Sequence, residues 1–214
     1  MKYSIVGKRI PTVICKLAKG ETVVAKKGSM CWMSSNVKLQ TVAKGGIGKS
    51  FLKIFAGEPI FENRYTAVDK SAEITFSPHA PCSIKALNIE PKRDVIVAKS
   101  AFIAAESGVE LSVKLNKKLK SGIFGKDGFT MHKLSGKGVA LIAIDSYALE
   151  YDLDEGQSII VGSGYLAAMD ATCTVEGESA QNAKSAVFGG DGVFNTVVKG
   201  PGKVILQTTP TDID

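Results

Sequence analysis

The stretch Phe124-Gly125-Lys126-Asp127-Gly128 decides the fold, because the chain repeats it. The same pattern returns as Phe188-Gly189-Gly190-Asp191-Gly192, and the residues that follow, up to Ile142 and Leu206, align without a gap. A looser copy, Phe55-Ala56-Gly57-Glu58-Pro59, lies in the first third of the chain. Internal repetition reports the architecture of a protein, so every other motif is interpreted against it.

Each copy contains the same order of strand-like segments. A polar turn with a β-branched run comes first, an apolar segment second and an alternating segment third, and alternation with a period of two puts one face in a core. No segment keeps a helical period for the ~10 residues that a globular helix needs. Trp32, the only tryptophan, lies in a second segment and is predicted to be part of the core. The first segments are 17–24, 89–97 and 153–161, the second are 30–33, 102–105 and 165–168, and the third are 37–41, 109–113 and 173–175.

These segments predict an all-β protein of three repeated antiparallel β units around a pseudo-threefold axis. A single domain, 1–214, is predicted to contain units at approximately 1–76, 77–142 and 143–209, followed by a short C-terminal tail, 210–214. Units of this length exceed ordinary solenoid repeats, so each is expected to be a small multi-stranded sheet. Three such units would bury their apolar faces against one another.

The composition is that of a globular chain. Of 214 residues, 44% are hydrophobic and 22% are charged, which excludes a disordered protein. The longest apolar run, 139–144, is far shorter than the ~18 residues of a membrane span, and no secretory or transit peptide is recognised. Cys15, Cys31, Cys82 and Cys173 are scattered, which favours buried, reduced thiols and a cytoplasmic location over disulfides.

The net charge of +6 is unevenly distributed. A basic segment, 112–137, holds seven lysines and one acid, and an acidic segment, 145–178, contains no lysine or arginine. Two interpretations stay open: the segments are two solvated faces, or they are complementary patches between the subunits of a head-to-tail ring. The second predicts a homo-oligomer. The candidate interaction patch in the basic segment consists of Lys114, Lys117, Lys118 and Lys120.

One motif resembles a phosphate-binding loop and is rejected. Residues 43–50, AKGGIGKS, fit a relaxed form of this loop, in which backbone N–H groups, a lysine and a hydroxyl hold a nucleotide and magnesium at the start of a helix. However, Gly57 and Pro59 would stop a helix almost at once, and the Lys49-Ser50 pair recurs as Lys120-Ser121 and Lys184-Ser185. The pair therefore belongs to the repeat and not to a nucleotide site.

No catalytic or metal-binding constellation is recognised, so no cofactor is predicted and the chain is not expected to be an enzyme. The only histidines are His79 and His132, and His132 aligns with Thr196 in the third copy. Neither histidine anchors a triad or a metal site. The acids of the Phe-Gly turns are interpreted as carboxylates that accept backbone N–H bonds. Few aromatic residues interrupt the lysines, so nucleic-acid binding is not favoured either.

A larger set of motifs resembles one protein family. Residues 24–34, VAKKGSMCWMS, together with 45–48, GGIG, and 56–61, AGEPIF, are similar to the signature of the altered-inheritance-of-mitochondria (mitochondrial biogenesis) family. The likeness continues through 102–111, FIAAESGVEL, and 188–208, and so covers nearly the whole chain. It implies an all-β fold like that of the tryptophan RNA-binding attenuation protein. It carries over no catalytic residues, because function lives in sites and not in folds.

Two functions are carried forward as hypotheses. The first is a non-enzymatic interaction or scaffold protein, a homo-oligomer in the cytoplasm or at the inner face of a membrane, that supports membrane-associated assemblies. The resemblance adds that mitochondrial members of the family look like inner-membrane organisation factors. Peripheral membrane association fits this hypothesis without a transmembrane segment. The second hypothesis is a ligand-binding module that holds RNA or a small metabolite at the interface between repeats or between subunits.

Overall fold

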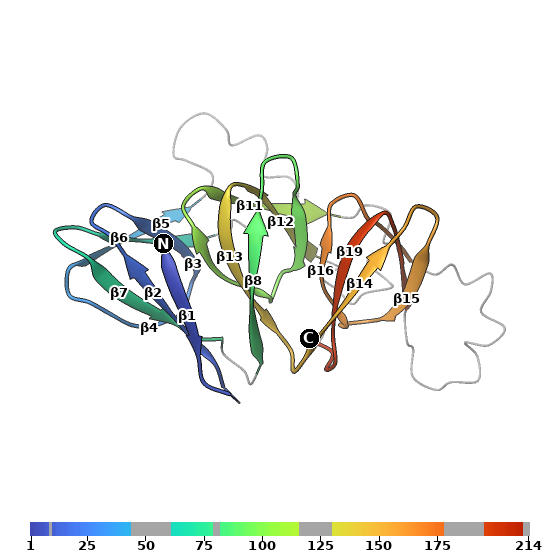
Figure 1. The fold of residues 1–214 in the computed structure, drawn as a ribbon, viewed down its shortest axis with the longest axis horizontal. Coiled ribbons are helices and arrows are strands. Elements are labelled where there is room, and N and C mark those ends of the chain that lie inside the picture. The colour runs from blue at the N-terminus through green and yellow to red at the C-terminus, as the bar shows by residue number, and fades with distance from the viewer. Residues whose placement is uncertain (9, 44–60, 79–81, 116–129, 178–194, 212–214) are drawn as a thin grey trace.

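A computed structural model describes residues 1–8, 10–43, 61–78, 82–115, 130–177 and 195–211 (Figure 1). Every regular element in this part of the chain is a β-strand, which confirms the all-β prediction. The three Phe-Gly turns and residues 44–50 of the phosphate-loop lookalike lie outside the described residues. The strands are β1 Lys2–Val6, β2 Thr12–Leu17, β3 Thr22–Lys26, β4 Met30–Met33, β5 Val37–Ala43, β6 Phe61–Ala67, β7 Ala72–Phe76, β8 Ser83–Ile89, β9 Val95–Ala98, β10 Phe102–Glu106, β11 Val109–Leu115, β12 Thr130–Gly136, β13 Gly138–Ile144, β14 Ala148–Leu153, β15 Ser158–Gly162, β16 Leu166–Asp170, β17 Thr174–Gly177, β18 Asn195–Lys199 and β19 Gly202–Gln207.

The burial of each strand follows from its apolar pattern. In β2, the buried residues Val13, Cys15 and Leu17 alternate with Thr12, Ile14 and Lys16, which are not buried. In β13 the apolar run is continuous, and Leu141 and its neighbour Ile142 are both fully buried in different core clusters. A strand that reads as a continuous apolar run is covered on both faces, whereas an alternating strand keeps one face toward solvent.

The strands form four antiparallel sheets. The two six-stranded sheets have the orders β5-β6-β3-β10-β13-β8 and β11-β12-β9-β16-β19-β14, so each strand of the second sheet is numbered six higher than its counterpart in the first. The remaining sheets have the orders β1-β2-β7-β4 and β15-β18-β17. Apart from β1, each smaller sheet corresponds to half of a six-stranded sheet. The strands β4, β7 and β2 correspond to β10, β13 and β8, and the strands β15, β18 and β17 correspond to β9, β12 and β11.

The sheets place the strands in a row of three groups (Figure 1). The first group, β1–β7, lies at the left of the view, the middle group, β8–β13, at its centre, and the last group, β14–β19, at the right. The predicted pseudo-threefold axis is therefore not confirmed. Each six-stranded sheet crosses from one group to the next, through the pairs β3·β10 and β9·β16. We call these pairs the two junctions.

The core continues across the junctions. One cluster combines Val23 and Tyr65 of the first group with Ala104 and Leu141 of the middle group, all of them almost completely buried. A second cluster joins Val97 of the middle group to residues of β16 and β19 in the last group. Burial of apolar surface at about 25 cal/mol per Å² is the main stabilising term in such contacts. The three groups are therefore held together by core packing as well as by strand pairing.

Two predictions about side-chain burial are wrong. Trp32 does not lie in the core but is 57% exposed, and Cys31 beside it is also exposed. The other three cysteines are free and buried, and burial raises the pKa of the Cys15 thiol to about 12 and that of Cys82 to about 11. Trp32 and Cys31 lie on β4, a strand at the edge of its sheet, and the apolar pattern alone gave no sign of this position.

Candidate functional site

The predicted lysine patch is only partly within the described residues. The backbone of Lys114 lies on β11, which pairs with β12. Lys117, Lys118 and Lys120 lie outside the described residues. The patch therefore stays a prediction.

The described residues contain no candidate metal-binding site. Among them, no group of three or more His, Cys, Asp and Glu side chains could hold a metal ion. The same residues include no helix with the length and apolar character needed to cross a membrane. The features with distinctive geometry are the two junctions and the sheet edges that correspond to them.

The two junctions share one register. In the first, Ala25, Val24 and Val23 of β3 lie opposite Ala104, Ala105 and Glu106 of β10. In the second, Val97, Ile96 and Val95 of β9 lie opposite Ala168, Met169 and Asp170 of β16. The register of β10 on β13 is interrupted between Phe102 and Ala104, and that of β16 on β19 between Leu166 and Ala168. Ala168 is thus the counterpart of Ala104, one residue later than the sequence motifs indicate.

A polar side chain caps the same backbone position beside each of three strands. The carboxylate of Glu106 accepts the Val139 N–H at 2.8 Å, and that of Asp170 accepts the Lys203 N–H at 3.0 Å. Beside β4, the hydroxyl of Ser34 accepts the Glu73 N–H at 2.9 Å. A hydrogen bond to a charged acceptor contributes about 1.5–3 kcal/mol and a neutral one about 1 kcal/mol. These caps fix the ends of β10, β16 and β4.

At both junctions the capping carboxylate also meets a cation from the preceding group. The Met1 amine lies 2.8 Å from Glu106 and 3.0 Å from Glu21. These hydrogen bonds, led by the one to Glu106, raise the pKa of the amine. At the second junction the Arg93 guanidinium lies 3.6 Å from Asp170. A carboxylate on one group therefore faces a positive charge on its neighbour at each junction.

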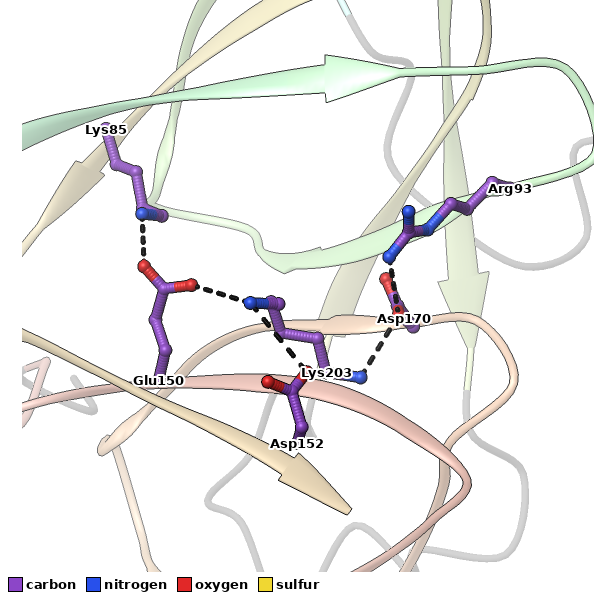
Figure 2. A network of polar contacts seen from close by, with 6 residues as sticks. All are labelled: Lys85, Arg93, Glu150, Asp152, Asp170 and Lys203. Atoms are coloured by element: carbon purple, nitrogen blue, oxygen red, sulfur yellow. Dashed lines mark hydrogen bonds and ion pairs between the residues drawn. The ribbon is translucent and has the colours of Figure 1, made fainter. Parts of the chain in front are cut away.

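An ion-pair network extends the second junction (Figure 2). Lys85 of β8 contacts Glu150 of β14, and Glu150 contacts Lys203 of β19 at 3.1 Å. Lys203 also lies 3.7 Å from Asp152. The two lysines, Lys85 first, hold the pKa of Glu150 below its usual range. Because these side chains are partly exposed to solvent, the network aligns the two groups more than it stabilises them.

His132 is a buried polar residue in the middle of β12. Burial first, then the positive charges of Lys99 and Lys26, lower its pKa to about 4, and its Nδ1 atom has no hydrogen-bond partner among the described residues. His132 lies opposite Val97, as Asn63 lies opposite Ala25 and Thr196 opposite Val161. All three are buried polar side chains in the central strands β12, β6 and β18.

Two sheet edges correspond to the junctions but have no neighbouring strand within the described part of the chain. There, β4 pairs only with β7, and β15 pairs only with β18. Trp32 on β4 is 57% exposed and Ile160 on β15 is 60% exposed. Sequence reasoning missed both edges. The alignment of Trp32 with Ala104 was a usable signal, because a bulky aromatic residue stands where a paired strand has alanine.

One family model and two bacterial relatives match nearly the whole chain. The family model described as Mitochondrial biogenesis AIM24 matches residues 3–209. An uncharacterised protein of Streptococcus pyogenes serotype M6 is 23% identical over 207 residues, which cover 94% of this chain and 82% of that protein. The crystal structure of a protein from Streptococcus pyogenes has a TM-score of 0.76 at 21% identity, covers 98% of this chain and 94% of that chain, and shares the fold. The chain therefore belongs to the Mitochondrial biogenesis AIM24 family.

Proposed function

We propose that this chain is a non-enzymatic interaction or scaffold protein that works as a homo-oligomer. The observation that carries the proposal is the exposure of Trp32 and Ile160 on two sheet edges. Exposed, unpaired edges invite pairing with another chain, and soluble proteins protect them unless they are used. Large aromatic side chains are also enriched at protein–protein interfaces.

The finer architecture belongs to the same proposal. We infer three repeated β units in a fold like that of the tryptophan RNA-binding attenuation protein. The support is the shared strand order and the recurrence of a left-handed backbone at Gly20, Lys92 and Gly156, which occupy the same place in the turns before β3, β9 and β15. Lysine rarely adopts this conformation, so its appearance at Lys92 points to a turn that all three units require.

A role in the cytoplasm or at the inner face of a membrane completes the proposal. The family description refers to mitochondrial biogenesis, and a scaffold for membrane-associated assemblies is consistent with it. The charge of +6 favours an anionic membrane surface over a neutral one. Such association would be peripheral.

Multi-angle light scattering of the purified chain tests the oligomer. We expect a mass at least twice that of the 22.6 kDa chain at micromolar concentration, and, if the apolar edges form the contact, little loss of mass as salt is raised. Loss of mass at high salt would instead favour the complementary charged segments. A monomer at every salt and protein concentration would contradict the proposal.

A ligand-binding module is the second candidate, and one observation favours it. Lys26 and Lys99 lie close enough to His132 for their positive charges to lower its pKa, and the Nδ1 atom of His132 has no hydrogen-bond partner among the described residues, which would suit a small anionic metabolite. RNA bound to the chain would be detected in the ultraviolet absorbance of the same light-scattering samples. A sample that is free of nucleic acid and gives no heat of binding when inorganic phosphate is titrated in a calorimeter would leave the interaction protein as the better account.

A further inference from the structure

The leftover edges match the two halves of a junction. Each junction pairs an earlier strand, β3 or β9, with a later strand, β10 or β16. The strand β15 is numbered six above β9, so it corresponds to the earlier strand of a junction. Likewise β4 is numbered six below β10, so it corresponds to the later strand of a junction. The described part of the chain therefore contains two complete junctions and the two separate halves of a third.

The local geometry of β4 is that of β10, the later strand of the first junction. Its register on β7 is interrupted between Met30 and Trp32, as the register of β10 is interrupted between Phe102 and Ala104. Ser34 caps its end as Glu106 caps the end of β10. The backbone of β4 is thus prepared for the same partner as β10, although no strand in the described part of the chain pairs with its outer edge.

Burial separates the paired positions from the unpaired ones. Ala104 and Ala168 are fully buried where a neighbouring strand covers them, whereas their counterpart Trp32 is exposed. Val24 and Ile96 are almost fully buried in the junctions, whereas their counterpart Ile160 is exposed. The same two positions are therefore apolar everywhere and lack cover only at the ends of the row.

One copy cannot bring its two edges together. In Figure 1, β4 lies in the group at the left end of the row and β15 at the right end, with the middle group between them. Pairing of these two edges with each other therefore requires two molecules. A contact between two different surfaces of identical chains is heterologous, and it produces a ring or an open filament.

We propose that copies of this chain associate head to tail, with β15 of one copy paired antiparallel to β4 of the next. The register of the junctions predicts Trp32 opposite Val161, Met33 opposite Ile160 and Ser34 opposite Ile159. The contact extends the sheets across the boundary between molecules and covers Trp32 and Ile160. This contact is the interface through which the proposed homo-oligomer forms, so the inference rests on the proposed function.

The polar groups at the two edges are compatible with this contact. Arg93, which faces Asp170 at the second junction, donates its backbone N–H to the Glu90 carbonyl at 3.0 Å, and Gln157 donates to the Asp154 carbonyl at 3.1 Å in the corresponding turn. Gln157, in the turn before β15, thus stands where the second junction has Arg93. Ser34, at the end of β4, stands where the junctions have the carboxylates of Glu106 and Asp170. The third junction would pair two neutral side chains and bury no uncompensated charge.

Disulfide trapping tests the register directly. The test chain carries Met33→Cys and Ile160→Cys in a Cys31→Ser background, which leaves only buried native thiols. Residues directly opposite in an antiparallel pair have Cα atoms about 4.5–5.5 Å apart, within the range that a disulfide spans. Mild oxidation is expected to give a ladder of covalent multimers on a non-reducing gel, which collapses to the monomer with reductant.

The matched control pairs Ile160→Cys with Leu39→Cys, an exposed position on β5 away from the β4 edge. This control should give no ladder. A chain that is multimeric by light scattering but gives no more ladder than the control would overturn the head-to-tail contact and leave the proposed function standing. A chain that is monomeric by light scattering would overturn both.

Discussion

Replacing Ala104 with aspartate is expected to lower the free energy of unfolding by more than about 4 kcal/mol, or to prevent folding altogether. Ala104 is fully buried at the first junction, opposite Ala25 and within the core cluster shared by the first and middle groups. A carboxylate there would lie among the buried apolar side chains of this cluster. It would also have little room, because well-packed cores tolerate little added volume. Urea denaturation followed by circular dichroism measures the loss.

The matched variant is Trp32→Asp, which places the same carboxylate at the corresponding position of β4. Because Trp32 is exposed, the free energy of unfolding should change by less than about 1 kcal/mol. Association between copies should instead weaken by about 100-fold, since the carboxylate would be buried in the contact. Equal loss of stability in the two variants would show that the β4 edge is as buried as the junctions.

Acid is expected to destabilise the chain through His132. Its pKa is about 4 in the folded state, below the ordinary value of 6.5, so the unfolded chain takes up a proton first as the pH falls. Stability is therefore fully present above pH 6.5 and declines as the pH falls from 6.5 toward 4, by about 2–3 kcal/mol in total. Urea denaturation at a series of pH values measures this decline.

The matched variant is His132→Asn, which copies the buried Asn63 at the corresponding position of β6. Asparagine does not titrate, so the stability of the variant should be flatter over the same pH range. Carboxylates titrate equally in both chains, so the difference between the two curves isolates the histidine. Parallel curves would mean that His132 is protonated as readily in the folded chain as in the unfolded one.

The strands could be predicted from the sequence because their cause is local. The alternating segments 37–41 and 109–113 are visible in the sequence and fall within β5 and β11, and the continuous apolar run 139–144 falls within β13. The absence of a sustained helical period excluded a helical protein. These inferences need only a residue and its neighbours in sequence.

The interaction surface could not be predicted in the same way. Trp32 was assigned to the core because its segment is apolar, but the exposure of a strand edge depends on which other strand lies beside it. That is a long-range property: besides β6, β3 pairs with β10, which lies far along the chain. The structure also aligns Ala104 with Ala168, one residue later than the sequence motifs do. The charge pattern directed attention to Lys114 and its neighbours, whereas the proposed contact is made by the exposed Trp32 on β4 and the exposed Ile160 on β15.

The central claim, a head-to-tail contact between two different edges, is tested most directly by mixing two singly blocked chains. Trp32→Asp damages the β4 edge and keeps β15, and Ile160→Asp damages β15 and keeps β4. Sedimentation velocity should show that each variant alone is a monomer and that the equimolar mixture forms a dimer, joined through the two intact edges. A mixture that stays monomeric, or single variants that still form multimers, would contradict the claim.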